Sequence, residues 1–218
     1  YLVLNQTYNK FIHYGEFNLN NASSPINFIE LITKPSNVLN KITIVEGWSQ
    51  LELNNLLSQY FNDFYYIPYQ DIIADTYYFN KNDDFKSFEN KLFNFKNDFF
   101  LKITDHDIFS SYTEDEIMII GSLIEKEGLD YMDKMQISSV IFNRLDRKMK
   151  LQIDATVLFS ITEGQYNLNR KLLISDLKIE HPYNTYLNKG LPPKPISYVG
   201  KNTINLILKN ISLEEFRY

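Results

Sequence analysis

The sequence predicts an α+β protein, with a small α/β module in the first part of the chain and a mainly helical domain after it. Two observations predict this division. Short segments that alternate apolar and polar residues, as strands do, occur before about residue 80. Beyond that point apolar residues recur at steps of three or four, which is helical spacing. With 218 residues, the chain can close one substantial hydrophobic core or two modest ones.

The α/β module is expected to contain a strand, a tight turn and a capped helix. The segment 42–45 alternates as a short strand does, and it ends at the turn Glu46-Gly47. Ser49, with Glu52 three residues later, has the pattern of a capping box, so a helix should begin there and run to about Tyr60. Upstream, strands are expected over 1–8 and 11–17, and a short helix over 26–33.

The helical domain is expected to follow a brief strand over 75–79. Thr113 and Glu116 form a second capping box, so a helix should open there and end near Gly128. A helix over 133–148 would place four apolar residues on one face, namely Ile137, Val140, Ile141 and Leu145. The remaining expected helical segments are 83–103, a capped turn over 175–179, and 201–209.

Charge and composition exclude several classes of function. Lys and Arg number 22 and Asp and Glu number 27, so the net charge is -5 and no basic field exists for binding nucleic acid. No run of 18 or more uncharged apolar residues occurs, so no membrane-spanning helix is predicted within these residues. The chain has Cys 0, which excludes disulfides, thiolate metal sites and cysteine nucleophiles and leaves the compartment open.

Two carboxylates at the end of an apolar helix are the first candidates for chemistry. At about 100° per residue, Glu125 and Glu127 point about 200° apart, so both cannot enter one cleft. A helical wheel places Glu127 close to the apolar arc of Ile117 and Ile124. Desolvation favours the protonated form of a carboxylic acid, so this position favours Glu127 as a proton donor. The alternative is that both are solvated residues at a helix end.

Two further segments carry groups that can bind sugar hydroxyls and amides. In an extended segment, Gln152 and Asp154 would face the same side, and Asn143 lies on the preceding helix. A second segment has four consecutive hydrogen-bonding side chains with two aromatic rings, namely Tyr183, Asn184, Thr185 and Tyr186. A solvated loop is the alternative for the first segment, and a structural turn is the alternative for the second.

The sequence gives little support for a metal site, a serine nucleophile or a nucleotide-binding site. The histidines His13, His106 and His181 have no ligand spacing, so no metal is expected. Ser122 lacks a G-x-S-x-G elbow, and no glycine-rich phosphate loop occurs. No cofactor is therefore expected.

Five segments, taken in order, resemble the YceG-like family of endolytic murein transglycosylases. They are Ser122 to Glu127, Val140 to Leu145, Met149 to Val157, Tyr183 to Tyr186 and Gly190 to Pro193. Upstream, Val45-Glu46-Gly47 and the helix after it are similar to the family's LysM-like subdomain, and Asp75-Thr76-Tyr77 resembles its Pro-Asp-Thr-Tyr segment. Departures are Ala155 in place of Pro, Gly128 in place of Thr and Ala74 in place of Pro. None removes a chemical group that the mechanism requires.

The resemblance implies a LysM-like α/β subdomain over residues 1–62 and a lysozyme-like catalytic domain over 63–218. It also implies a single-pass protein of the bacterial inner membrane whose catalytic domain faces the periplasm, with an anchor helix before this chain and a terminal strand after it. The implied substrate is the glycan strand of peptidoglycan, cut internally between N-acetylmuramic acid and N-acetylglucosamine to leave a 1,6-anhydro end. Cell-wall synthases are the implied protein partners.

In this family the second Glu of a Glu-Lys-Glu triplet is the acid/base, which carries over to Glu127. One carboxylate suffices because the muramyl 6-hydroxyl attacks its own anomeric carbon, whereas the usual hydrolase needs two carboxylates. The expected substrate-positioning residues are Gln152, Asp154, Tyr183, Asn184 and Tyr186, with Glu125, Asn143 and Thr185 as secondary candidates. The rival functions are a hydrolytic muramidase and a non-catalytic glycan-binding scaffold for cell-wall synthases.

Overall fold

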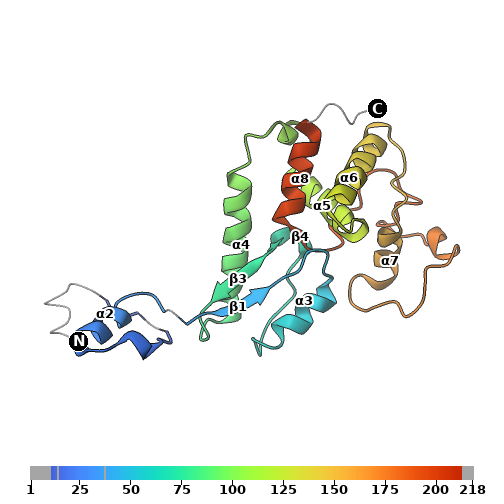
Figure 1. Ribbon diagram of the computed structural model, residues 1–218. Coiled ribbons are helices and arrows are strands. Elements are labelled where there is room, and N and C mark those ends of the chain that lie inside the picture. The colour runs from blue at the N-terminus through green and yellow to red at the C-terminus, as the bar shows by residue number, and fades with distance from the viewer. Residues whose placement is uncertain (1–10, 14, 37, 213–218) are drawn as a thin grey trace.

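A computed structural model describes residues 11–13, 15–36 and 38–212, which form an α+β architecture (Figure 1). The α-helices are α2 (Pro25–Ile32), α3 (Gln50–Leu57), α4 (Phe85–Leu101), α5 (Glu114–Glu127), α6 (Tyr131–Asp146), α7 (Asp154–Thr162) and α8 (Lys201–Ser212). The strands are β1 (Asn40–Thr43), β2 (Ile73–Ala74), β3 (Thr76–Phe79) and β4 (Val199–Gly200). The 3₁₀ turns are η1 (Leu19–Asn21), η2 (Tyr69–Asp71), η3 (Asp107–Ser110) and η4 (Asp176–Lys178).

Two short strand pairs connect distant parts of the chain. β1 pairs antiparallel with β3, in a register that runs from Asn40 opposite Phe79 to Thr43 opposite Thr76. β2 pairs in parallel with β4, so that Ala74 lies opposite Gly200. The second pair brings the start of α8 back to the centre of the molecule, between α4 and α5 (Figure 1).

The buried apolar residues form two cores. The larger core draws on α5, α6, α8 and the β2–β4 pair, and the smaller core draws on β1, α3, β3 and the first half of α4. The smaller core includes residues on both sides of residue 62, for example Leu57 and Phe79. The domain boundary expected at residue 62 therefore does not coincide with the division between the cores, because β1 takes its strand partner from beyond that point.

Helix α5 carries the two candidate glutamates, and its local sequence fixes both of its ends. The Thr113 hydroxyl accepts a hydrogen bond from Glu116 N at 3.2 Å, and Thr113 N donates to Glu116 Oε2 at 2.8 Å. This capping box was predicted, as was the box in which Ser49 N donates to Glu52 Oε2 at 2.7 Å at the start of α3. At the other end, Gly128 N donates to Ile124 O at 2.9 Å and closes the helix.

Several local expectations need correction. Residues 11–13 and 15–17 form no strand, and residues 1–10 and 14 lie outside the described part of the chain. Val140 is 50% exposed and does not share the buried face of α6, which runs through Ile141. The β2–β4 pair was not predicted, because strands of two residues carry almost no periodicity.

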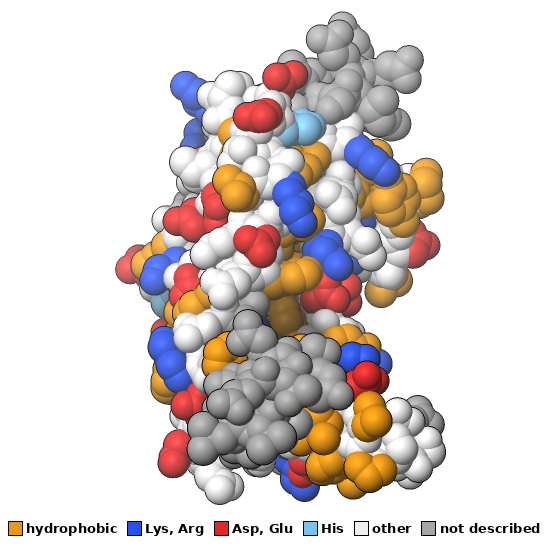
Figure 2. All heavy atoms as spheres, turned by 90° about the vertical axis from the view of Figure 1, so that its left-hand side faces the viewer, with side chains coloured by type: hydrophobic (Ala, Val, Ile, Leu, Met, Phe, Trp, Pro, Cys, Tyr) orange, Lys and Arg blue, Asp and Glu red, His pale blue; other side chains and the backbone are white. Residues whose placement is uncertain are grey.

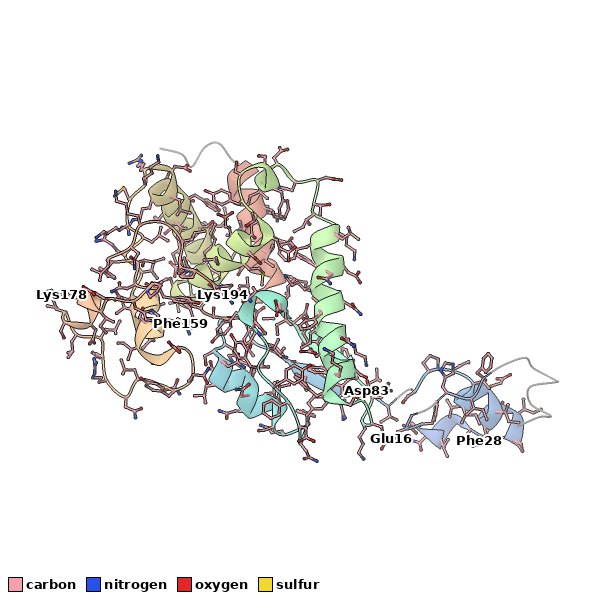
Figure 3. The ribbon with its side chains drawn as sticks, turned by 180° about the vertical axis from the view of Figure 1, so that it is seen from behind. Glu16, Phe28, Asp83, Phe159, Lys178 and Lys194 are labelled. Atoms are coloured by element: carbon pink, nitrogen blue, oxygen red, sulfur yellow. The ribbon has the colours of Figure 1, made fainter. Side chains whose placement is uncertain are left out.

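The N-terminal elements extend away from the two cores. Figure 3 places Glu16 and Phe28 in this part, and an ion pair of 3.1 Å joins Glu16 to Lys81. On the face seen in Figure 2, hydrophobic side chains gather at the lower end. Phe11 and Ile26 of the N-terminal part are 74% and 58% exposed. Along the described residues, none of the helices combines the length and the apolar character needed to span a bilayer.

Candidate active site

The two glutamates at the end of α5 lie in opposite environments. The Glu125 side chain is only 1% exposed, and its Oε2 accepts a hydrogen bond from Lys134 Nζ of α6 at 2.5 Å. Its Oε1 accepts from Gly200 N of β4 at 3.1 Å. Glu127 is exposed. The helical-wheel expectation that Glu127 is the sheltered residue was therefore wrong, because the groups that cover a glutamate here come from α6 and β4.

Gly128 permits the close approach of Lys134 to this helix end. A Cβ atom at position 128 would lie 2.4 Å from Lys134 Cγ, so a larger residue would push Lys134 outward. Gly128 thus allows the packing of the Glu125–Lys134 ion pair.

Glu127 lies at the start of α7. Its Oε1 accepts a hydrogen bond from Ala155 N at 3.4 Å, and Ala155 is in the first turn of that helix. This bond is long for an N–H···O hydrogen bond. The N-terminal end of a helix carries unpaired N–H groups, and Ala155 N is one that the Glu127 carboxyl group reaches.

A second carboxylate and a phenol lie beside Glu127. Asp154 Oδ1 accepts a hydrogen bond from the Tyr186 hydroxyl at 2.5 Å. This bond, together with partial burial and the nearby charges of Asp154 and Glu127, raises the pKa of Tyr186 to about 12. Tyr186 therefore stays protonated at neutral pH and keeps Asp154 in one orientation.

Threonine hydroxyls fix the segment that precedes α7. Thr185 Oγ1 accepts from Ile153 N at 3.0 Å and shares a 2.8 Å hydrogen bond with the Thr156 hydroxyl. Gln152 N donates to Thr185 O at 3.2 Å, and Gln152 adopts a left-handed backbone with φ of 54°. Gln152 and Asp154 are exposed on either side of buried Ile153. The segment is not extended as expected, because Gln152 has a left-handed backbone and Asp154 begins α7.

The segment Tyr183–Tyr186 contains structural residues as well as candidate contacts. Asn184 is fully buried, and its amide nitrogen donates to Leu177 O and Ile179 O at 3.1 and 2.8 Å. Thr185 is 1% exposed. Both side chains therefore position the loop, and their burial leaves neither of them exposed to a substrate. Tyr183 is half-buried with its ring 4.7 Å from that of Phe159, a residue of α7 labelled in Figure 3.

Two groups of this site were missed by reasoning from residue types. Ala155 contributes a backbone N–H, which every residue but proline carries, so no sequence signal marks it. Arg144 of α6 donates to Leu151 O and lies close enough to Tyr186 to influence its titration. Arg144 belongs to the polar cluster Asn143-Arg144-Leu145 of the sequence, but it was not among the expected site residues. The candidate Asn143 is half-buried on the same helix.

A pocket of about 160 Å³ adjoins the site, between α3 and α7. Its wall includes Lys126 and Ala155, the chain neighbour and the hydrogen-bond partner of Glu127. Glu127 itself stands at the edge of this hollow and does not line it.

The described residues offer no group of three or more His, Asp or Glu side chains placed to hold a metal ion. His106 and His181 serve local structure, because the Nδ1 of each accepts a backbone N–H two residues later. Ser122 is buried, and its hydroxyl donates to Ile119 O at 2.7 Å.

Comparisons with known proteins agree on one family. The sequence profile of the YceG-like family matches residues 1–213. An endolytic murein transglycosylase of Bacillus subtilis (strain 168) is 42% identical over 88 residues, which are 40% of this chain and 23% of that protein. An endolytic murein transglycosylase of Streptococcus pneumoniae (strain D39) is 39% identical over 87 residues, or 38% of this chain and 15% of that protein.

A crystal structure shows the same fold. A YceG-like protein from Listeria monocytogenes superimposes with a TM-score of 0.67 at 21% sequence identity, covering 95% of this chain and 79% of that one. The matches to the two curated relatives, in contrast, span less than a quarter of their length.

Proposed function

Since this chain belongs to the YceG-like family, we propose that it is an endolytic lytic transglycosylase of peptidoglycan, with Glu127 as the acid/base. It cuts the β-1,4 bond between N-acetylmuramic acid and N-acetylglucosamine inside a glycan strand and leaves a 1,6-anhydromuramyl end. Such cuts would limit the length of nascent strands. The relatives from Bacillus subtilis and Streptococcus pneumoniae are both named endolytic murein transglycosylases, which supports the proposal.

The observation that carries the proposal is the placement of Glu127. It is an exposed carboxylate at the end of a rigid helix, next to a helix N-terminus and the Asp154–Tyr186 pair. A bound glycan would cover this carboxylate and exclude water from it, which strengthens its interactions with the sugar. Glu125, two residues earlier, is occupied by Lys134 and Gly200 and has no exposed oxygen to offer a substrate.

In the proposed reaction, protonated Glu127 gives its proton to the glycosidic oxygen as the bond to the muramyl anomeric carbon breaks. The muramyl 6-hydroxyl then attacks that carbon, and the Glu127 carboxylate takes its proton. One proton is donated and one is recovered, so the residue returns to its starting state and no water enters the product. An attached nucleophile has an effective-molarity advantage of up to about 7–11 kcal/mol over a separate one.

Tyr186, Asp154 and Gln152 are the proposed positioning residues for the sugar. Tyr186 holds one oxygen of Asp154, which leaves the other free to accept from a sugar hydroxyl. Gln152 is exposed beside them, in a backbone conformation that is uncommon for a residue other than glycine. Tyr183 offers a half-buried ring to the same region.

We extend the proposal to the domain organisation, cellular location and partners of the protein. The module of β1, α3 and β3 would be LysM-like, and the larger helical part would be lysozyme-like. Because murein lies outside the cytoplasmic membrane, the catalytic part would act in the periplasm, carried by a single-pass anchor in the inner membrane. Cell-wall synthases are the proposed partners.

A series of glutamate substitutions tests the role of Glu127. Glu127→Gln should abolish the release of fragments from purified peptidoglycan while leaving the unfolding transition unchanged. Glu180→Gln removes an exposed carboxylate elsewhere and is the matched control, which should keep full activity. Full activity in Glu127→Gln would remove this residue from its role.

A hydrolytic muramidase is the second candidate, because Asp154 places another carboxylate next to the Glu127 site. In a hydrolase, Asp154 would activate water or attack the sugar. Asp154→Asn would then be as damaging as Glu127→Gln, and the products would carry one more water. In the transglycosylase, Asp154→Asn should weaken substrate binding and retain measurable turnover.

A further inference from the structure

The pocket between α3 and α7 lies where the α/β module meets the helical part of the protein. Hydrogen bonds join its walls. Leu51 N of α3 donates to Gly164 O at 3.0 Å, which joins the module to the loop after α7. Lys126 Nζ donates to Gly47 O at 3.2 Å, which joins α5 to the turn before α3. The pocket is therefore present before any ligand binds.

Gly164 allows the loop to approach this closely. Its φ is +72°, and a Cβ atom at this position would lie 2.3 Å from the hydroxyl of Tyr69. The loop is further fixed because the Tyr166 hydroxyl donates to Ile161 O at 2.8 Å. Tyr166 nevertheless remains 51% exposed, so its ring is held in place with much of its surface available.

The lining of the pocket favours a neutral ligand with both apolar and amide groups. Leu158, Phe159 and Ile196 contribute apolar surface, and Tyr166 and Asn167 contribute an aromatic ring and an amide. The two charged residues of the wall already have partners. Glu52 Oε2 accepts from Ser49 N and Oγ at 2.7 and 2.9 Å, and Lys126 is bound to Gly47 O.

We propose that this pocket is a subsite for an N-acetylated sugar of the strand that lies across Glu127. The ring of Tyr166 would stack on the pyranose, the Asn167 amide would bind the acetamido group or a hydroxyl, and the apolar surface would receive the acetyl methyl group. The α/β module would then form one wall of the substrate groove through Ser49 and Glu52. This inference rests on the proposed function, because it assigns a second contact to the same glycan.

Binding measurements in the Glu127→Gln background test the subsite without turnover. The probe is a soluble, peptide-free glycan strand of alternating N-acetylglucosamine and N-acetylmuramic acid, titrated by calorimetry. Tyr166→Ala should weaken affinity roughly three- to tenfold, the loss expected for one aromatic contact. Tyr166→Phe keeps the ring and loses the bond to Ile161 O, so its loss of affinity should be smaller than that of Tyr166→Ala. Asn167→Ala should weaken binding without disturbing the loop.

Tyr78→Ala is the matched control, because Tyr78 is 56% exposed on β3 and does not line the pocket. Unchanged binding by both Tyr166→Ala and Asn167→Ala would overturn the subsite, as would an equal loss in Tyr78→Ala. An effect confined to peptide-bearing strands would also overturn it, since the pocket would then hold the peptide. If the parent protein releases no fragments from peptidoglycan while glycan binding still depends on Tyr166, the proposed function fails and the subsite stands.

Discussion

The carboxylates of Glu125 and Glu127 leave the same helix turn and end in opposite surroundings. Glu125 is enclosed by Lys134 and Gly200, and Glu127 is exposed at Ala155 N. A helix places residues two apart on nearly opposite sides, so one glutamate can fasten the helix end while the other meets a substrate. The first role concerns the stability of the fold, and the second concerns chemistry.

Lys134→Met should destabilise the protein more than Glu125→Gln. The lysine substitution leaves a carboxylate that is 1% exposed without its counter-charge, which should cost about 3 kcal/mol. Glu125→Gln retains an oxygen for Gly200 N and leaves a lysine that can turn toward solvent, so about 1–2 kcal/mol is expected. Urea unfolding measures the loss in unfolding free energy for both variants. Equal losses would contradict a buried ion pair between Glu125 and Lys134.

Gly121→Ala should destabilise the contact between α5 and β4. A Cβ atom at this position would lie 2.6 Å from Val199 Cγ1, so the strand must move or the valine must change its rotamer. The expected loss in the free energy of unfolding is about 1–3 kcal/mol. Gln136→Ala, on the exposed side of α6, is the control and should stay within about 0.5 kcal/mol of the parent.

Tyr198→Phe should weaken the junction between the two cores. The buried Tyr198 hydroxyl lies 2.8 Å from Gln50 Oε1 and 2.6 Å from Ile67 O. The hydroxyl has one hydrogen and donates to one of these acceptors at a time, so its removal leaves a buried acceptor without a donor, at a cost of about 1–3 kcal/mol in unfolding free energy. Tyr78→Phe removes an exposed hydroxyl and should have no measurable effect, so similar losses in both variants would contradict the assignment.

The Tyr186–Asp154 hydrogen bond predicts an alkaline pH dependence. The pKa of Tyr186 is raised to about 12, so the folded state favours the protonated phenol relative to an unfolded tyrosine with a pKa of about 10. Its stabilising contribution is complete below about pH 10 and is lost as the pH rises toward about 12. The difference in unfolding free energy between the parent and Tyr186→Phe should therefore shrink between about pH 10 and pH 12. A constant difference would contradict this account.

Local signals predicted the elements that carry the site. The boxes Ser49–Glu52 and Thr113–Glu116 identified the starts of α3 and α5, because capping depends on residues three apart. The alternation around Ile153 suggested an extended segment, whereas Gln152 has a left-handed backbone and Asp154 begins α7, although both side chains are exposed.

Features that depend on long-range packing were not predictable. The shelter of Glu125 comes from Lys134 on another helix and from Gly200 near the end of the chain. The burial of Asn184 likewise follows from carbonyls that a loop turns inward, which no local pattern records. A helical wheel gives the angle between two residues and contains no information on what packs against either.

The most direct test of the central claim is the source of the oxygen at the new glycan end. Peptidoglycan is digested by the protein in water enriched in heavy oxygen, and the products are analysed by mass spectrometry. Attack by the muramyl 6-hydroxyl predicts anhydro ends that carry no solvent oxygen, and their loss in Glu127→Gln. Reducing ends that carry the heavy isotope would contradict the account and identify a hydrolase.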